Sequence, residues 1–196
     1  MINLKIIPKD FNVLVSSGVD SIAAAHILKF MFRRDFTVYH FNHNLRPQNN
    51  VMEEGVRKFC NKFDIPLVVC KLETDGTEGE GELREKRLKV MDQNGGHFVT
   101  AHHLDDAVEN YMMNVAKGCP EFTPIKEVSQ NIIHPFLRRT KDFFSKYIVD
   151  NQLEEFIVED ETNTDTKYLR NKIRHEVVPL FDWTNLRKVV LKKFYI

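Results

Sequence analysis

The stretch Ser16-Ser17-Gly18-Val19-Asp20-Ser21 has the residue types of an anion-binding turn. It follows a short apolar run and opens directly into a helical pattern that begins at Ile22. The first backbone N–H groups of such a helix have no intrahelical acceptor, so a bound anion can accept their hydrogen bonds. The serine hydroxyls add donors, Gly18 permits close approach of a ligand, and Asp20 indicates a bound cation or a donor to orient. An ordinary capped turn between a strand and a helix is the alternative.

A second cluster, Ala101-His102-His103-Leu104-Asp105-Asp106-Ala107-Val108-Glu109, places two histidines beside three acids at the start of a predicted helix. Carboxylates in a first helical turn interact favourably with the helix dipole. Capping explains one of these acids, but it does not explain three acids beside two histidines. A metal site is a weaker interpretation, because adjacent histidine side chains point apart and no matching third ligand set is evident.

Two arginine pairs have the spacing of neighbours on one face of a helix. Arg84 and Arg87 are three residues apart, and Arg170 and Arg174 are four apart with Asn171 between them. Each pair could bind a phosphate or a base edge through its forked guanidinium groups. The alternatives are surface ion pairs for the first pair, and pairing with the acidic stretch 159–165 for the second.

The charge distribution is uneven, although the 28 Lys and Arg residues balance the 28 Asp and Glu residues. Residues 167–196 contain eight Lys and Arg residues and only two acids, so this segment carries +6 and the preceding segment carries −6. A basic end on an acidic body suggests contact with nucleic acid. A solvated basic helix is the alternative.

Cysteine usage and hydropathy predict a soluble protein of a reducing compartment. Cys60, Cys70 and Cys119 lie far apart without a CxxC pair, which argues against a disulfide framework or a structural metal site. The N-terminus lacks the pattern of a signal peptide, and no run approaches the ~18 apolar residues of a membrane span. We therefore expect a cytoplasmic protein with no membrane partner.

Strand-like and helix-like runs alternate along most of the chain with short connections, which is typical of βαβ units and a parallel sheet. We predict a doubly wound α/β fold with a parallel five-stranded sheet over residues 1–155. Residues 156–196 are predicted to form a small appendage, an acidic loop followed by a basic helical extension. The predicted strands are 11–15, 36–41, 66–72, 96–101 and 132–136, and the predicted helices are 22–32, 49–63, 82–93, 104–117 and 140–151, the last N-capped by Thr140.

The polar clusters follow predicted strands, at segments 16–21, 40–46 and 100–106. Ligands of open parallel sheets bind beyond the carboxyl ends of the strands, so we expect these segments to meet at one edge. The first loop is neither a Walker A sequence nor a G-x-G-x-x-G fingerprint.

The first loop resembles the SGGxDS loop of the PP-loop ATP pyrophosphatases, with Ser17 where that family usually has its first glycine. Together, the motifs between about residues 12 and 180 resemble those of the tRNA(Ile)-lysidine synthase family, whose members typically carry further C-terminal domains. Other departures are Asn42 for an Asp, Leu88 for a Tyr and Ile157 for a Trp. The matching motifs are SxGxDS at 16–21, Asn42-His43-Asn44-Leu45-Arg46-Pro47, Arg84-x-x-Arg87, AHHLDDxxE at 101–109, His134-Pro135-Phe136-Leu137, Asp160-x-Thr162-Asn163, Arg170-Asn171-x-x-Arg174 and Pro179.

The resemblance implies a ligase that uses ATP and Mg²⁺ to join L-lysine to C2 of the wobble cytidine of tRNA(Ile) with the anticodon CAU. An adenylated cytidine is the intermediate, and lysidine, AMP and pyrophosphate are the products. Residues Ser16, Ser17, Gly18, Val19, Asp20 and Ser21 would bind ATP, with Asp20 also holding the metal ion.

The same resemblance implies three catalytic residues, Asp20, Arg84 and Asp106. Arg84 would stabilise charge at the α-phosphate or the adenylated base. Asp106 would orient or deprotonate the lysine amine. The residues implied to contact lysine or tRNA are His43, Arg46, Arg87, His103, Asp105, Glu109, Asn163, Arg170, Asn171 and Arg174.

Three other functions are compatible with parts of this pattern. A PP-loop tRNA thiolase would need a reactive cysteine pair or cluster ligands, and the three cysteines lack that spacing. An amide-forming ligase such as NAD or GMP synthetase would leave the AHHLDD and RNxxR motifs unexplained. An inactive nucleotide-binding remnant is favoured by Ser17. For the synthase, a homodimer could supply further tRNA-binding surface.

Overall fold

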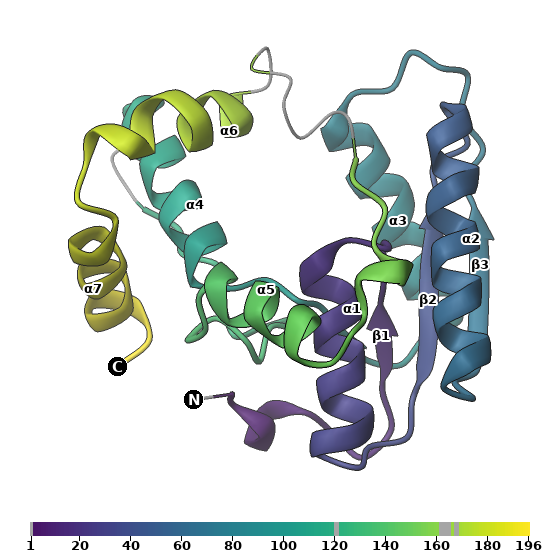
Figure 1. Cartoon of the computed structure of the whole chain (residues 1–196). Helices are drawn as coiled ribbons and strands as arrows, with labels where there is room; N and C mark the ends of the chain where they lie inside the picture. The colour runs from purple at the N-terminus through teal and green to yellow at the C-terminus, as the bar shows by residue number, and fades with distance from the viewer. Residues whose placement is uncertain (1, 120–121, 161–165, 167–168) are drawn as a thin grey trace.

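The computed structural model describes residues 2–119, 122–160, 166 and 169–196. Its core is a six-stranded sheet in the order β3-β2-β1-β4-β6-β5 (Figure 1). All neighbouring strands are parallel except β5, which pairs antiparallel with β6. The strands are β1 (Asn12–Leu14), β2 (Thr37–Asn42), β3 (Leu67–Lys71), β4 (Phe98–Val99), β5 (Val128–Ser129) and β6 (Ile132–Ile133).

The predicted doubly wound α/β class is confirmed, and each of the five predicted strands overlaps an observed one. The sixth strand, β5, was missed by sequence reasoning. It has only two residues, both exposed, and it is joined to β6 by the two-residue turn at Gln130 and Asn131. A strand this short has no periodic hydrophobic pattern from which it could be recognised.

The five predicted helices are also present, with small differences at their ends. Pro47 occupies the first turn of its helix, where its missing N–H group has no partner to lose. The longer helices are α1 (Val19–His26), α2 (Pro47–Lys62), α3 (Glu80–Asn94), α4 (Leu104–Ala116), α5 (Lys141–Asp150) and α7 (Trp183–Phe194); the short ones are α6 (Leu169–Lys172), η1 (Leu4–Ile6), η2 (Ile27–Met31), η3 (Glu154–Phe156), η5 (Ile173–Val177) and η6 (Val178–Leu180).

Two hydrophobic clusters hold these elements together. In the larger one, side chains of α1, α2 and α5 pack against Val13 of β1 and Val38 of β2. In the smaller one, Val108 of α4 packs with Val190 and Tyr195 near the end of the chain. Figure 1 shows α6 and α7 beside α4, on the side of the molecule away from α2 and α3. The C-terminal helices are therefore attached to the body of the fold through α4.

The sheet order creates a topological switch point between β1 and β4. The chain moves outward from β1 to β2 and β3, and then returns to place β4 on the other side of β1. Connections that leave β1 and β4 consequently diverge and leave a crevice beyond the carboxyl ends of these two strands. The segment after β1 begins at Val15 and the segment after β4 begins at Thr100, so two of the predicted polar clusters flank this crevice.

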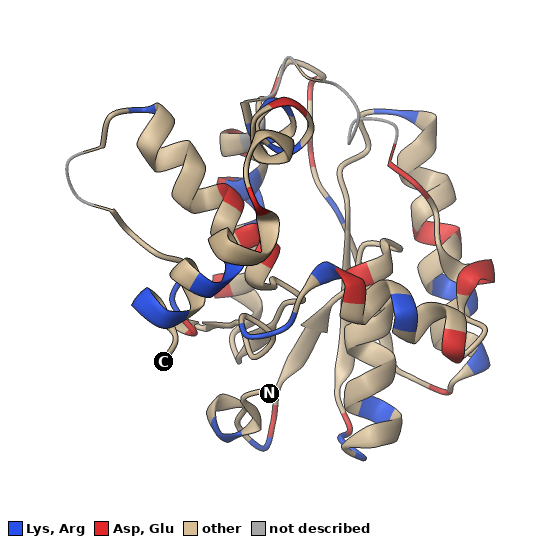
Figure 2. Ribbon diagram, turned by 60° about the vertical axis from the view of Figure 1, so that its left-hand side comes forward, with Lys and Arg blue, Asp and Glu red and all other residues tan. Residues whose placement is uncertain are grey.

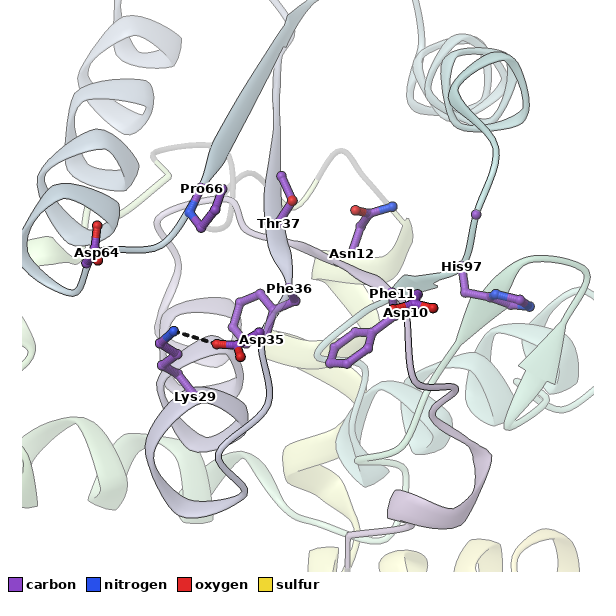
Figure 3. Close-up of a pocket in the computed structure, with 11 residues that line it drawn as sticks. Asp10, Phe11, Asn12, Lys29, Asp35, Phe36, Thr37, Asp64, Pro66 and His97 are labelled. Carbon is purple, nitrogen blue, oxygen red and sulfur yellow. Dashed lines mark hydrogen bonds and ion pairs between the residues drawn. The ribbon is translucent and has the colours of Figure 1, made fainter.

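A cavity of about 630 Å³ lies at the opposite edge of the sheet (Figure 3). Asn12 and Thr37, the first residues of β1 and β2, line it together with the ion pair between Lys29 and Asp35. The predicted site residues do not line this cavity, so we do not assign it to the site. Within the described residues, no helix is long and apolar enough to span a bilayer.

Candidate active site

The Ser/Gly loop leads into the N-terminus of α1, with Gly18 as the N-cap residue. Ser21 shapes the loop, because its Oγ accepts the Ser16 N–H at 3.1 Å and its hydroxyl donates to the Gly18 carbonyl at 3.0 Å. The Ser17 hydroxyl points away from the loop and donates to the Phe156 carbonyl at 2.6 Å. The prediction that all three serine hydroxyls face a ligand is therefore wrong for Ser17 and Ser21. The exposed Ser16 side chain and the backbone N–H groups at the start of α1 remain as donors.

Asp20 and His103 join the loop after β1 to the loop after β4. Asp20 Oδ2 lies 3.5 Å from His103 Nε2, and His103 is buried at the N-cap of α4. A reciprocal capping box fixes the imidazole: the His103 N–H donates to Asp106 Oδ2 at 2.9 Å, and the Asp106 N–H donates to His103 Nδ1 at 3.3 Å. Because Nδ1 accepts a hydrogen bond, the neutral ring carries its proton on Nε2, facing Asp20.

The surroundings of His103 favour its protonated form. Burial alone would lower the pKa of His103, but the hydrogen bond to Asp20 and the charges of Asp106 and Asp105 raise it above the ordinary value. Asp20 also offers a second carboxylate oxygen, because its buried Oδ1 has no hydrogen-bond partner among the described residues. An unpartnered carboxylate oxygen at the mouth of an anion-binding loop suits Mg²⁺, which prefers hard oxygen ligands.

The acids of α4 are paired with the two arginines of the C-terminal region. Arg170 Nη2 donates to Asp106 Oδ1 at 2.9 Å and Arg170 Nε donates to Glu109 Oε2 at 2.8 Å. Arg174 adds two bonds to Glu109, at 2.6 Å from Nε and 2.9 Å from Nη2. Figure 2 shows the acidic and basic segments interleaved where these helices meet.

This network decides the charge state of Asp106. Burial opposes ionisation, but the charges of His103, His102 and Arg170 hold the pKa of Asp106 below its ordinary value. Arg170 and Arg174 were predicted to contact tRNA, and the structure instead turns both toward carboxylates of the protein. The spacing of the two arginines predicts their common face correctly but not their partner, which lies more than sixty residues away in the chain.

Asp105 has a different environment from the neighbouring Asp106. Its Oδ2 accepts the Lys141 N–H at 2.6 Å and its Oδ1 accepts Arg187 Nε at 2.8 Å. Thr140 is the N-cap residue of α5, as predicted, but its side chain makes no capping hydrogen bond. Asp105 supplies that acceptor from α4 instead. Both oxygens of this predicted recognition residue therefore bind groups of the protein.

A buried polar cluster beside Asp106 was not assigned by sequence reasoning. The Thr100 hydroxyl lies 2.7 Å from His102 Nδ1 and 2.6 Å from His134 Nδ1. Burial and repulsion from His102 lower the pKa of His134 to about 3, and burial also lowers the pKa of His102. Arg84, exposed on α3, adds its positive charge to both histidines. The signal available in the sequence was the HPFL motif at 134–137, which directly follows the observed β6.

The remaining predicted residues lie around the end of β2. Burial, followed by the positive charge of Arg87, lowers the pKa of His43 to about 4. Arg46 is the N-cap residue of α2 and also acts electrostatically on His43. Asn171 is buried beside the arginine network, and Asn163 lies outside the described residues. His43, Arg46 and Arg87 therefore form one group, separate from the group around Asp106.

The fold and the site together are typical of nucleotide-binding α/β proteins of the doubly wound class. The features that indicate this class are the sheet order, the loop at the switch point and the contact between Asp20 and His103. The family model of the PP-loop domain matches residues 5–181, and the chain belongs to this family.

Curated relatives extend the comparison. The tRNA(Ile)-lysidine synthase of Lactiplantibacillus plantarum is 34% identical over 184 residues, which cover 85% of this chain and 41% of that protein. The tRNA(Ile)-lysidine synthase of Exiguobacterium sibiricum is 32% identical over 178 residues, with 86% and 42% covered. The chain thus spans about two fifths of the length of these curated relatives.

Among solved structures, the U34-tRNA thiolase NcsA from Methanococcus maripaludis is similar in fold. Its TM-score is 0.67 at 14% identity, with 94% of this chain and 70% of that chain covered. At this identity the likeness concerns the fold alone.

Proposed function

We propose that the chain forms lysidine in tRNA(Ile) with the anticodon CAU, using ATP and L-lysine. The observation that carries this proposal is the contact of 3.5 Å between Asp20 and His103, which joins an ATP-type loop to the acid-rich start of α4. A nucleotide bound at the loop would then react next to Asp106, which lies one helical turn from His103. The curated relatives named tRNA(Ile)-lysidine synthase support the choice of substrate.

The loop provides the groups for the nucleotide. Backbone N–H groups at the start of α1 bind the β- and γ-phosphates, and Asp20 Oδ1 holds Mg²⁺. Held there, Mg²⁺ would supply positive charge against the phosphate oxygens of the leaving pyrophosphate. Arg84 binds the α-phosphate or the adenylated base, because a planar guanidinium suits such an anion.

The reaction proceeds in two substitutions. The C2 oxygen of cytidine bonds to the α-phosphorus, and the bond from that phosphorus to the bridging oxygen breaks to release pyrophosphate. The lysine Nζ then bonds to C2, the C2–O bond breaks, and AMP leaves with the oxygen. Asp106, held ionised by its neighbours, attracts and orients the lysine ammonium, whose ordinary pKa is about 10.4. A carboxylate with a lowered pKa is a weak base, so we assign Asp106 to orientation, and the proton that Nζ must lose before it attacks C2 passes to water.

The other contacts belong to the same proposal. His43, Arg46 and Arg87 contact the tRNA from the end of β2, and Glu109 holds Arg170 and Arg174 beside the reacting groups. A reducing cytoplasm suits the free thiols of the three cysteines. A homodimer would add tRNA-binding surface.

A thiolase is less well supported. Cys60 is buried and burial raises its pKa to about 12, whereas Cys119 is exposed and far along the chain. Within the described residues, no group of three His, Cys, Asp or Glu side chains is placed to hold a metal ion. A reactive thiolate needs a lowered pKa and access to its substrate, and Cys60 has neither.

The deciding experiment supplies the purified chain with ATP, labelled lysine and unmodified tRNA carrying a CAU anticodon. We expect label in the tRNA and one AMP formed per lysine. A tRNA with U in place of the wobble C, and an Asp20→Asn variant, are the matched controls and should incorporate none. A folded chain that leaves the tRNA unlabelled would show that the proposal is wrong, and sulfur-dependent modification would instead identify a thiolase.

A further inference from the structure

Ser17 has a backbone conformation that non-glycine residues rarely adopt. Its φ angle is 65°, in the left-handed region, and its side chain is completely buried. Glycine adopts this conformation without steric cost, so a serine here needs a compensating interaction. Two hydrogen bonds supply it: the Ser17 hydroxyl donates to the Phe156 carbonyl at 2.6 Å, and the Val158 N–H donates to the Ser17 carbonyl at 3.0 Å. We call residues 156–159 the strap.

Gly55 of α2 packs directly against the Ser17 hydroxyl. A Cβ added to Gly55 of α2 would overlap with Ser17 Oγ and would lie 3.1 Å from the Phe156 carbonyl oxygen. Because Gly55 has no side chain, it leaves room for the Ser17 hydroxyl. The nucleotide loop, α2 and the strap are in contact at this position. Gln48 of α2 also donates to the Glu159 carbonyl at 2.9 Å, which fixes the far end of the strap.

The strap has little support on its other face. A hollow of about 390 Å³ lies between Val19, Ile157 and Glu159 on one side and α5 on the other. Phe156 anchors the start of the strap in the core, but Val158 is only half-buried. The bonds to Ser17 are thus a main restraint on the middle of the strap.

We propose that Ser17 is a positioning residue that clamps the nucleotide loop to the strap. The clamp sets the direction of the backbone immediately before Gly18 and Val19, whose N–H groups face the phosphates. Binding of a nucleotide to the loop and immobilisation of the strap are therefore coupled, and each favours the other. This inference rests on the proposed function for the identity of the nucleotide as ATP.

The test compares Ser17→Gly with the wild-type chain. Glycine adopts the left-handed backbone without strain and removes the whole CH2OH side chain, hydroxyl included, so a loss of binding cannot come from added strain. We expect the dissociation constant for the α,β-methylene analogue of ATP with Mg²⁺ to rise about tenfold, the size expected for one lost buried hydrogen bond. The KM for ATP should rise similarly with little change in kcat. Ser17→Ala should bind more weakly still, because it keeps the strain and loses the hydroxyl.

Hydrogen exchange at the Val158 amide gives a second readout. It should be faster in Ser17→Gly than in the wild type, and the ATP analogue should slow it about tenfold in the wild type but much less in the variant. Ser145→Ala, which removes an exposed hydroxyl near the same hollow, is the matched control and should behave as wild type. Gly55→Ala should cost less in the Ser17→Gly background, where the overlap with Oγ is gone.

The outcomes separate this inference from the proposed function. If the wild type binds the analogue and Ser17→Gly binds it equally well with unchanged Val158 exchange, the clamp is overturned and the proposed function stands. If the wild type does not bind the analogue, the proposed function is wrong and the nucleotide coupling is overturned with it. Tight binding by the wild type with the order Ser, Gly, Ala at position 17 supports both.

Discussion

Asp105 and Asp106 are neighbours in the chain, yet their carboxylates bind arginines from different parts of the C-terminal region. Asp105 pairs with Arg187 of α7, and Asp106 pairs with Arg170 of α6. Asp105 also accepts the first N–H of α5, whereas Asp106 closes the capping box with His103 beside the loop contact. Both acids therefore tie helices together, but the Asp105 side chain is 3% exposed, whereas the Asp106 side chain is 14% exposed and lies beside the loop contact, next to the proposed reaction.

We predict that Asp106→Asn folds and binds ATP but forms lysidine at least about a hundred times more slowly, the range typical for loss of one electrostatic contact in a transition state. The amide keeps the shape of the carboxylate and loses the charge that attracts the lysine ammonium. The measurement is single-turnover lysine transfer at saturating ATP. Undiminished turnover would remove Asp106 from the chemistry.

Asp105→Asn should lower the stability of the fold and leave lysine transfer intact, the reverse of Asp106→Asn. The Asp105 residue is 2% exposed, and both of its oxygens accept hydrogen bonds inside the protein. Neutralising Asp105 leaves Arg187 with the exposed Asp142 carboxylate, 3.0 Å from Nη1, in place of its buried counter-charge. The expected loss of unfolding free energy in urea is on the order of 3 kcal/mol. The KM for lysine should stay unchanged at temperatures where the variant is folded. A raised KM with normal stability would place Asp105 in the lysine site.

Glu109 and Arg174 should be strongly coupled in a double-mutant cycle. Glu109 is nearly inaccessible and accepts two bonds from Arg174, whose side chain is 28% exposed. Glu109→Gln removes the carboxylate that accepts both Arg174 bonds, Arg174→Gln leaves Glu109 with its bond from Arg170, and the double change removes both members of the pair. We expect a coupling free energy of about 2 kcal/mol from urea unfolding. Additive effects would mean that the ion pair makes no net contribution to stability.

His134 should make the protein less stable in mild acid. The pKa of His134 is about 3 in the folded state and 6.5 in the unfolded chain. Between pH 3 and pH 6.5 the unfolded state therefore binds a proton that the folded state does not bind. Stability is therefore lost as pH falls through 6.5, by about 2 kcal/mol at pH 5 relative to pH 8. His134→Asn, which cannot titrate, should flatten the dependence of unfolding free energy on pH by that amount. An unchanged pH profile would contradict the assignment.

Lys188 and Lys192 are better candidates for phosphate contacts than the paired arginines. Both are exposed on α7 and lie one turn apart. Replacing both with alanine should weaken tRNA binding and reduce the slope of log affinity against log salt by about two, one unit per lost contact. Lys5→Ala with Lys9→Ala removes the same charge from an exposed N-terminal segment and should leave the slope unchanged. Equal slopes for both pairs would argue against α7 as a tRNA surface.

The sequence by itself determined the α/β class of the core and the edge where the polar motifs gather. Alternating hydrophobic periods identify βαβ units, and parallel strands bring the loops at 16–21 and 100–106 to one edge whatever the details of packing. At that edge the structure places Asp20 beside His103.

Only the tertiary structure decided which partner each polar side chain takes. The spacing of Arg170 and Arg174 predicts a common helix face, but phosphate and carboxylate satisfy a guanidinium equally well. The choice depends on α6 lying against α4. Ser17 likewise has a hydroxyl that could donate to a phosphate. It donates to the Phe156 carbonyl instead, because the backbone at Ser17 adopts a left-handed turn that the sequence pattern does not specify. Local patterns fix which elements form, whereas contacts between distant segments fix where their polar groups point.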